Sequence, residues 1–324
     1  MANSKPRVLA TRLFPPDVEA RLTAHFDAVL NPEDRLYDSP SLTKAAAGCD
    51  AIMCAAGDSL NAATIAALPT SIRMIATFSV GYEHVDVAAA AKRNILVANT
   101  PDVLTDATAD IAMLCLLGAA RRAHEGAALL RAHHWVGWAP TQLMGTHVTG
   151  KRLGIFGMGR IGQAMADRAR AFRMQIHYSN RSRLSPDEEK GAVFHANPDD
   201  MLAHCDFLSI NAPMTPQTRK WVNAERIARL PKGAIVVNTA RGGVVDDEAL
   251  IAALKSGHLA SAGLDVFDGE PKLHQGYYDL TNAFLLPHMG SATVETRNAM
   301  GFKALDNLET YLLRNQTPPN LVTA

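Results

Sequence analysis

Short apolar runs alternate with amphipathic or alanine-rich stretches along most of this 324-residue chain. A short apolar run between polar residues is typical of a buried parallel strand, and the stretches between such runs are typical of the helices that cover both faces of a sheet. The pattern predicts strands in the first hundred residues at 8–10, 50–54, 74–78 and 95–98. It predicts a second series at 153–156, 175–179, 206–211, 234–238, 261–266 and 284–286. The expected fold class is α/β, with two doubly wound parallel sheets.

Two long helical patterns indicate how these series are divided into domains. Residues 107–131 predict one helix between the two series, and residues 291–313 predict a final helix that is too short to form a domain alone. We therefore expect residues 1–98 and 291–324 to form a discontinuous, flavodoxin-like substrate domain. Residues 99–290 would form a dinucleotide-binding Rossmann domain inserted into it. Two chain crossings between the domains would act as a hinge beside a ligand cleft.

A glycine-rich loop follows the first strand of the second series. It reads Gly157-Met158-Gly159-Arg160-Ile161-Gly162 and opens a helical pattern at 163–169. In a dinucleotide-binding loop the first glycine permits a tight turn and the second lets the backbone approach a pyrophosphate. The third lets helix and strand pack closely, with the phosphates at the helix N-terminus. The loop predicts dinucleotide binding, which does not by itself imply redox chemistry.

Composition narrows the class of protein. Lys plus Arg and Asp plus Glu both number 32, so no global basic field favours nucleic acid or an anionic membrane. No stretch reaches the 18 or more apolar residues of a membrane span, and the N-terminal segment lacks the apolar region of a secretory signal. A cytoplasmic enzyme is expected. The four scattered cysteines are expected to be reduced and packed, and no ligand spacing predicts a metal site.

Four polar residues lie at or just beyond the ends of consecutive predicted strands of the second series: Arg241, Asp265, Glu270 and His288. Ligands of open parallel sheets bind outside the carboxyl ends of strands, so these side chains should gather at one rim. Arg241 offers a planar fork for a substrate carboxylate, and His288 can supply the proton that a reduced carbonyl oxygen needs. Glu270 would favour the imidazolium form of His288. The set suits reduction of a carbonyl beside a carboxylate.

These motifs together resemble the D-isomer-specific 2-hydroxyacid dehydrogenase family over essentially the whole chain. The nearest likeness is to its glyoxylate and hydroxypyruvate reductases, or D-glycerate dehydrogenases. The resemblance is carried by the glycine loop and by the segments Val236-Val-Asn-Thr-Ala-Arg-Gly-Gly243, Gly263-Leu-Asp-Val-Phe267 with Gly269-Glu-Pro271, and Pro287-His-Met-Gly-Ser291. It implies that Arg241, Glu270 and His288 are the catalytic residues, in the roles given above.

The resemblance also implies binding residues outside that set. The family's carboxylate-binding backbone loop falls on Ser79, Val80 and Gly81, and an arginine that holds the polar end of hydroxypyruvate falls on Arg297. Its cofactor-contacting threonine and the aspartate beside the nicotinamide carboxamide fall on Thr108 and Asp265. The Trp135-x-x-Trp138 segment resembles the family's dimerisation arm, in which an aromatic can reach the partner subunit's active site. A homodimer joined through the cofactor domains is therefore expected.

The end of the strand at 175–179 departs from the NAD-binding pattern. An NAD-specific domain places Asp or Glu about 20 residues beyond the glycine loop, to bind the ribose 2′-hydroxyl. Here the strand is followed by Asn180-Arg181-Ser182-Arg183, which offers donors to a 2′-phosphate and no carboxylate to repel it. The sequence predicts a preference for NADP(H), with NAD(H) also accepted.

The expected function is NADPH-linked reduction of glyoxylate to glycolate and of hydroxypyruvate to D-glycerate. One alternative is a D-lactate or bulky 2-oxo acid dehydrogenase, because the sequence does not give the volume enclosed by the loops near residues 54–57, 79–81 and 297. Another is a dinucleotide-sensing binding protein, since transcriptional corepressors share this fold. The physiological direction and the preferred 2-oxo acid are left open.

Overall fold

The computed structural model describes residues 5–323, and residues 1–4 and 324 of the expected substrate domain lie outside it. The chain divides into two compact units, Met1–Leu104 with Ala292–Ala324 (unit 1) and Thr105–Ser291 (unit 2). The predicted boundaries, after 98 and after 290, differ slightly from this division. Residues 99–104 belong to unit 1, and Ser291 belongs to unit 2.

Unit 1 contains a five-stranded parallel sheet in the order β2-β1-β3-β4-β5. Its strands are β1 (Arg7–Ala10), β2 (Asp27–Val29), β3 (Ala51–Ala55), β4 (Met74–Phe78) and β5 (Leu96–Ala98). Its helices are α1 (Pro16–His25), α2 (Ser39–Ala45), α3 (Ala62–Ala67), α4 (Val87–Lys92) and α12 (Val294–Leu312). This is the flavodoxin-like strand order, completed by the C-terminal helix as expected.

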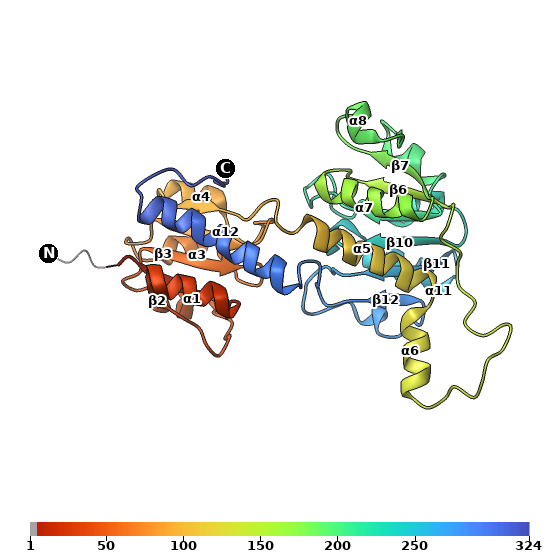
Figure 1. Ribbon diagram of the computed structural model, residues 1–324, viewed down its shortest axis with the longest axis horizontal. Coiled ribbons are helices and arrows are strands. Elements are labelled where there is room, and N and C mark those ends of the chain that lie inside the picture. The colour runs from red at the N-terminus through yellow and green to blue at the C-terminus, as the bar shows by residue number, and fades with distance from the viewer. Residues whose placement is uncertain (1–4, 324) are drawn as a thin grey trace. The chain divides into compact units, whose positions relative to one another are not determined.

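Both faces of the unit 1 sheet are buried. Along β3, Ile52 and Cys54 join one apolar cluster with residues of α2, α3 and α4. Ala51 and Met53 point to the other face, in a cluster with residues of α1 and α12. Figure 1 shows α1 and α12 together on that side of the sheet. A strand buried on both faces reads as a continuous apolar run, which is why the sequence predicted it.

Unit 2 contains a seven-stranded parallel sheet in the order β12-β11-β10-β9-β6-β7-β8. Its strands are β6 (Arg152–Phe156), β7 (Gln175–Ser179), β8 (Val193–Phe194), β9 (Phe207–Ile210), β10 (Ala234–Asn238), β11 (Leu259–Leu264) and β12 (Ala283–Leu285). The order reverses between β6 and β9, as in a Rossmann domain. The sequence predicted six of these strands and missed β8, which has only two residues and is half exposed at the sheet edge.

The helices of unit 2, apart from α6, lie along both faces of its sheet. The helices of this unit are α5 (Thr105–Ala120), α6 (Ala123–Arg131), α7 (Arg160–Ala171), α8 (Pro186–Glu189), α9 (Pro198–Leu202), α10 (Ala224–Arg229) and α11 (Asp247–Lys255), with 3-10 turns at Gly242–Val244 and Gln275–Tyr277. Helices α5 and α7 contribute to one apolar cluster, and α9, α10 and α11 contribute to the other. The two-sided cover explains the near-continuous apolar strands of this series.

The prediction of a single helix over residues 107–131 is wrong. The structure has two helices, α5 and α6, separated at Arg122, whose left-handed backbone (φ 54°) interrupts the helical path. Arg122 pairs with Glu125 in the first turn of α6. Helix α5 is buried against the sheet, whereas α6 has no buried residue and stands away from the sheet in Figure 1.

Two further expectations concern composition. The four cysteines, Cys49, Cys54, Cys115 and Cys205, are buried and unpaired, as expected for packed thiols. Among residues 5–323, no helix has both the length and the apolar character required to cross a membrane.

Candidate active site

The three glycines of the 157–162 loop have three different surroundings. Gly157 has φ 93°, and a Cβ there would lie 2.6 Å from the backbone nitrogen of Ala212. A Cβ at Gly162 would lie 2.5 Å from Gly157 O, so close packing of α7 requires glycine at that position. A Cβ at Gly159, at the N-cap of α7, would meet nothing within 4 Å. Open space directly at a helix N-terminus fits the approach of a pyrophosphate.

Two buried polar atoms next to this loop also lack protein partners. They are Asn211 Oδ1, just after β9, and Thr239 Oγ1, just after β10, and neither has a hydrogen bond within the described residues. Strands β6, β9 and β10 are neighbours, so both atoms lie at the carboxyl edge that carries the glycine loop. Buried polar atoms are normally hydrogen-bonded. A bound dinucleotide would supply the missing partners, and the sequence did not single out either residue.

Asn180, predicted to contact the cofactor, holds the glycine loop. Its Oδ1 accepts a hydrogen bond from Met158 N at 2.6 Å, and its Nδ2 donates to Met158 O at 3.3 Å. Gly157 N also donates to Ser179 O at 3.0 Å. The end of β7 therefore fixes the shape of the loop that would bind the pyrophosphate. Arg160 and Ile161 form the first turn of α7, with the Arg160 side chain exposed and Ile161 partly buried.

The remaining residues after β7 divide into two kinds. Arg183 makes a two-point ion pair with Glu189, with Nε–Oε1 and Nη2–Oε2 distances of 2.7 and 3.0 Å. Arg183 hydrogen-bonds Glu189 and, with the hydroxyl of Tyr178, lowers the pKa of that carboxyl to about 2. Arg181 and Ser182 are exposed, and within residues 5–323 Arg181 has no ion-pair partner. The Arg183 guanidinium is thus paired with Glu189, whereas the Arg181 guanidinium could bind an anion such as a 2′-phosphate.

The turn after β10 presents Arg241. Asn238 shapes this turn, because its Oδ1 accepts from Ala240 N and its Nδ2 donates to Arg241 O, both at 3.0 Å. A Cβ at Gly242 would lie 1.8 Å from the backbone carbon of Phe267. Glycine at 242 therefore allows the loop after β10 to lie directly on the loop after β11. The half-buried Arg241 is brought beside the loop that carries Glu270.

Glu270 and His288 form a hydrogen-bonded pair. His288 Nδ1 lies 2.7 Å from Glu270 Oε2, and Glu270 Oε1 accepts from Phe267 N at 2.7 Å. Burial acts to raise the pKa of Glu270, but the hydrogen bonds from His288 and Phe267, with the charges of His288 and Arg241, lower it overall. The carboxylate is therefore ionised and orients the imidazole, with Nδ1 as the donor. Within the described residues, His288 Nε2 has no protein partner.

Asp265 holds the segment that carries His288. Its backbone oxygen accepts from His288 N at 2.9 Å, and its carboxylate accepts from Met289 N and Gly290 N at 2.7 and 2.8 Å. Asp265 is completely buried, and this burial raises its pKa. His288 itself has φ 55°, a conformation that non-glycine residues rarely adopt outside constrained sites. Asp265 therefore fixes an unusual backbone, a role that the sequence did not predict.

Thr108 lies beside the same segment. It is buried in the first turn of α5, and its Oγ1 donates to Gly290 O at 3.3 Å. The structure thus brings Arg241, Glu270, His288 and Asp265 together at the carboxyl edge of the unit 2 sheet, as the strand ends predicted, and places Thr108 beside Gly290.

Two predicted substrate-binding elements belong to unit 1. Ser79, Val80 and Gly81 directly follow β4, and within residues 5–323 no protein group accepts from the N–H groups of Val80 and Gly81. Two free backbone donors in succession can bind an anion. Arg297 is exposed in the first turn of α12, and in the described chain its side chain has no partner.

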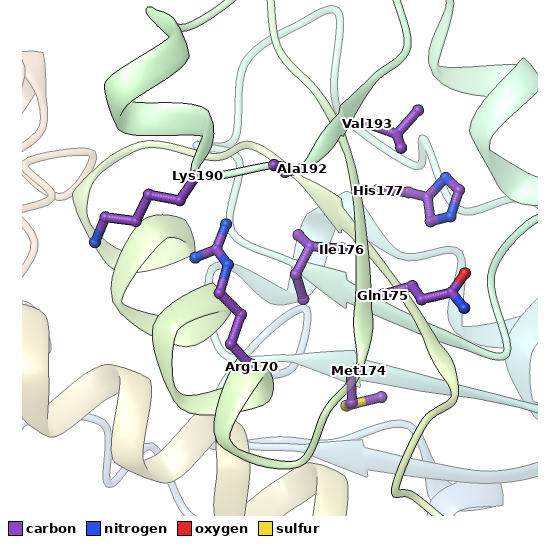
Figure 2. Close-up of a pocket in the computed structure, with 9 residues that line it drawn as sticks. Arg170, Met174, Gln175, Ile176, His177, Lys190, Ala192 and Val193 are labelled. Atoms are coloured by element: carbon purple, nitrogen blue, oxygen red, sulfur yellow. The ribbon is translucent and has the colours of Figure 1, made fainter.

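A pocket of about 400 Å³ lies elsewhere in unit 2, between the end of α7, the start of β7 and the chain before β8. Figure 2 shows the side chains of Arg170 and Lys190 on one side of β7 and those of Gln175 and His177 on the other. Both cations already pair with Asp167, at 2.8 and 2.9 Å. This pocket contains none of the predicted site residues, and it lies at the amino end of β7, away from the glycine loop.

Comparison with known proteins places this geometry in a family. Residues 113–290 match the model of the D-isomer specific 2-hydroxyacid dehydrogenase, NAD binding domain. A glycerate dehydrogenase of Hyphomicrobium methylovorum is 43% identical over 308 residues, which cover 94% of this chain and 96% of that protein. A glyoxylate reductase of Thermococcus kodakarensis is 41% identical over 98% of this chain and 96% of its own length.

A solved structure is similar throughout. The NADPH-dependent glyoxylate/hydroxypyruvate reductase of Sinorhizobium meliloti, in complex with NADP and malonate, has a TM-score of 0.88 and 36% identity, and the match covers 98% of this chain and 97% of that one. The chain therefore belongs to the D-isomer specific 2-hydroxyacid dehydrogenase family of oxidoreductases, whose Rossmann domain binds a nicotinamide dinucleotide. The resemblance, the fold class and the enzyme class predicted from the sequence are confirmed.

Proposed function

We propose that this protein reduces small 2-oxo acids with NADPH, converting glyoxylate to glycolate and hydroxypyruvate to D-glycerate. The observation that carries the proposal is the Glu270–His288 pair, whose Nδ1–Oε2 distance of 2.7 Å leaves Nε2 of the ring unpartnered in the described residues. Arg241 lies within electrostatic range of this pair. The relatives named glycerate dehydrogenase and glyoxylate reductase support the substrate class.

Each residue of the set has a distinct task in this proposal. Glu270 accepts from His288 Nδ1 and so keeps the ring oriented, and His288 donates the proton from Nε2 to the substrate oxygen. Arg241 binds the substrate carboxylate and polarises the adjacent carbonyl. In unit 1, the free N–H groups of Val80 and Gly81 are the proposed donors to a substrate carboxylate, and Arg297 is the proposed partner of the polar end of hydroxypyruvate. The bound nicotinamide cofactor supplies the hydride.

The glycine loop, Asn211 and Thr239 would hold the dinucleotide in this proposal, together with Arg160, Ile161, Thr108 and Asp265. The preference for NADPH rests on the residues after β7. No carboxylate occupies positions 180–183, and the exposed Arg181 and Ser182 can donate to a 2′-phosphate. The NADP complex of the Sinorhizobium reductase supports this part of the proposal. NADH is expected to be a weaker alternative cofactor.

A homodimer formed through unit 2 is also part of the proposal. The segment after α6 exposes several large apolar side chains, including Val136 at 99% and Trp138 at 82%. Apolar side chains exposed in one contiguous segment mark an interaction site more often than isolated ones do. Sedimentation analysis of wild type should give a dimer, at twice the 34.8 kDa mass of one chain. The Trp138→Ser variant should shift toward the monomer mass of 34.8 kDa. A monomeric wild type would contradict this part alone.

The first experiment is a set of initial rates with glyoxylate and hydroxypyruvate, each with NADPH and NADH. Rapid oxidation of NADPH is expected with both acids. Turnover only with lactate-like or bulky 2-oxo acids would favour the dehydrogenase alternative. Tight NADPH binding without turnover of any 2-oxo acid would favour a dinucleotide sensor.

A further inference from the structure

In the loop of residues 79–81, each backbone carbonyl oxygen accepts a hydrogen bond from elsewhere in unit 1 or from the loop itself. Thr100 N donates to Ser79 O at 2.9 Å, and Asn99 Nδ2 donates to Val80 O at 2.8 Å. Ser79 Oγ donates to Gly81 O at 2.6 Å. A peptide group is planar, so a carbonyl that is fixed also fixes the N–H of the next residue. The contacts on Ser79 O and Val80 O therefore set the directions of the free N–H groups of Val80 and Gly81.

The hydrogen bond to Gly81 O fixes the peptide group that follows Gly81, and so the C-terminal side of the loop, and it is the end of a longer chain of contacts. Thr77 Oγ1 lies 2.7 Å from Ser79 Oγ and 2.8 Å from His84 Nε2. Since the Ser79 hydroxyl proton is used on Gly81 O, Ser79 Oγ must accept from Thr77. The Thr77 hydroxyl proton is then also used, so Thr77 Oγ1 accepts from His84 Nε2–H. Donors thus run in one direction, from His84 through Thr77 and Ser79 to Gly81.

We propose that Thr77, His84 and Asn99 are positioning residues, which hold the 79–81 loop in the conformation that binds the substrate carboxylate. None of the three needs to touch substrate. Chains of hydrogen bonds that run in one direction strengthen one another, and Thr77 is completely buried, so water does not compete with its hydroxyl. Donors that are already oriented bind an anion without paying to reorganise.

This inference rests on the proposed function, because it assumes that the loop binds a carboxylate. A merely structural chain would affect stability, kcat and KM without selectivity. A positioning chain should mainly affect the KM of the 2-oxo acid, because ground-state and transition-state binding of the carboxylate are weakened together. The KM of NADPH should stay unchanged.

The test compares Thr77→Val, which keeps the side-chain shape and removes the hydroxyl, with Thr77→Ser, which keeps the hydroxyl. Thr64→Val is the matched control. It removes a buried hydroxyl of the same unit whose only side-chain hydrogen bond within residues 5–323 is at 3.3 Å, to the N-cap Asn61. Thr77→Val should raise the KM for glyoxylate about tenfold, the effect of one lost hydrogen bond, with little change in kcat. Thr77→Ser should restore the KM.

Asn99→Ala is an independent second variant. The backbone contacts of Asn99, to Asn320 O and from Asn307 Nδ2, remain in this variant. It should raise the same KM, and His84→Gln, which keeps a donor, should behave more like wild type than His84→Leu. Hydrogen exchange supplies a readout without substrate. The amides of Thr100 and Val85, which donate to Ser79 O and Tyr82 O, should exchange faster in Thr77→Val and Asn99→Ala than in wild type or Thr64→Val.

If Thr77→Val and Thr64→Val had equal KM values and equal hydrogen-exchange rates, the inference would be overturned. The proposed function would still stand, provided that wild type reduced the 2-oxo acids. A parallel loss of kcat and thermal stability in Thr77→Val, not rescued by serine, would also overturn the inference. If wild type reduced no 2-oxo acid, the proposed function would fail. The exchange rates would then decide alone whether these residues hold the loop.

Discussion

Units 1 and 2 have the same architecture, a parallel sheet between two layers of helices, but they prepare their carboxyl edges differently. Unit 2 presents ionisable side chains that are held by carboxylates: Glu270 orients His288, and Asp265 holds the backbone that carries it. Unit 1 presents backbone N–H groups after β4, oriented by neutral donors and acceptors. Charge concentrates chemical reactivity at one edge, whereas oriented amides supply binding without a titrating group.

The strongest way to break the comparison is to remove His288, the proposed proton donor of unit 2. In His288→Ala, kcat for glyoxylate reduction should fall by roughly 10²–10⁴-fold, the usual contribution of a positioned acid. NADPH binding, measured by fluorescence titration, should be retained. Wild-type turnover in this variant would remove His288 from the proposed mechanism.

Arg241→Lys keeps the charge of the unit 2 site and removes the planar fork. A lost hydrogen bond to a charged partner costs roughly 1.5–3 kcal/mol, so kcat/KM should fall about 10–100-fold. The measurement is steady-state kinetics over a range of glyoxylate concentrations. An unchanged kcat/KM would show that a positive charge at this position is enough for substrate binding and that the planar fork is not needed. The contrast with the neutral loop of unit 1 would then be weaker.

Cofactor choice can be tested with two arginines two positions apart. Arg181→Ala should raise the KM for NADPH about tenfold and leave that for NADH nearly unchanged, because only NADPH carries the 2′-phosphate. Arg183→Ala is the matched control, since its guanidinium is paired with Glu189. It should lower stability more than it lowers NADPH affinity. The reverse result would assign the phosphate to Arg183.

The smallest expected effect is on stability in acid. The pKa of Glu189 is lowered from 4.5 to about 2, chiefly by Arg183 and then by Tyr178. A lowered pKa means that this carboxylate stabilises the fold fully above pH 4.5 and loses that contribution as pH falls from 4.5 toward 2. The free energy of unfolding, measured with urea, should therefore fall more for wild type than for Glu189→Gln as the pH is lowered from 6 to 3. Parallel curves for the two proteins would contradict the assignment.

Local signals in the sequence were sufficient for much of the fold. Strands buried on both faces, such as β4 and β10, read as apolar runs and were predicted at their observed bounds. Two short helices were missed although their signals are present: Asp38 and Ser185 each begin a capping box, with a proline in the first two residues of the helix. By contrast, two other features had no signal to predict them. Strand β8 has only two residues, and nothing in the sequence around Arg122 marks the break between α5 and α6.

By itself, the sequence determined the fold class and the glycine loop, and it singled out Arg241, Glu270 and His288 as one set, because strand ends of a parallel sheet meet at one edge. Only the tertiary structure decided which polar groups face one another. Asn180 turned out to hold the glycine loop, and Arg183 to pair with Glu189. The contacts behind residues 79–81 join residues from separate strands and loops. Hydrogen bonds depend on distances of a few tenths of an ångström between atoms far apart in sequence, which no local pattern encodes.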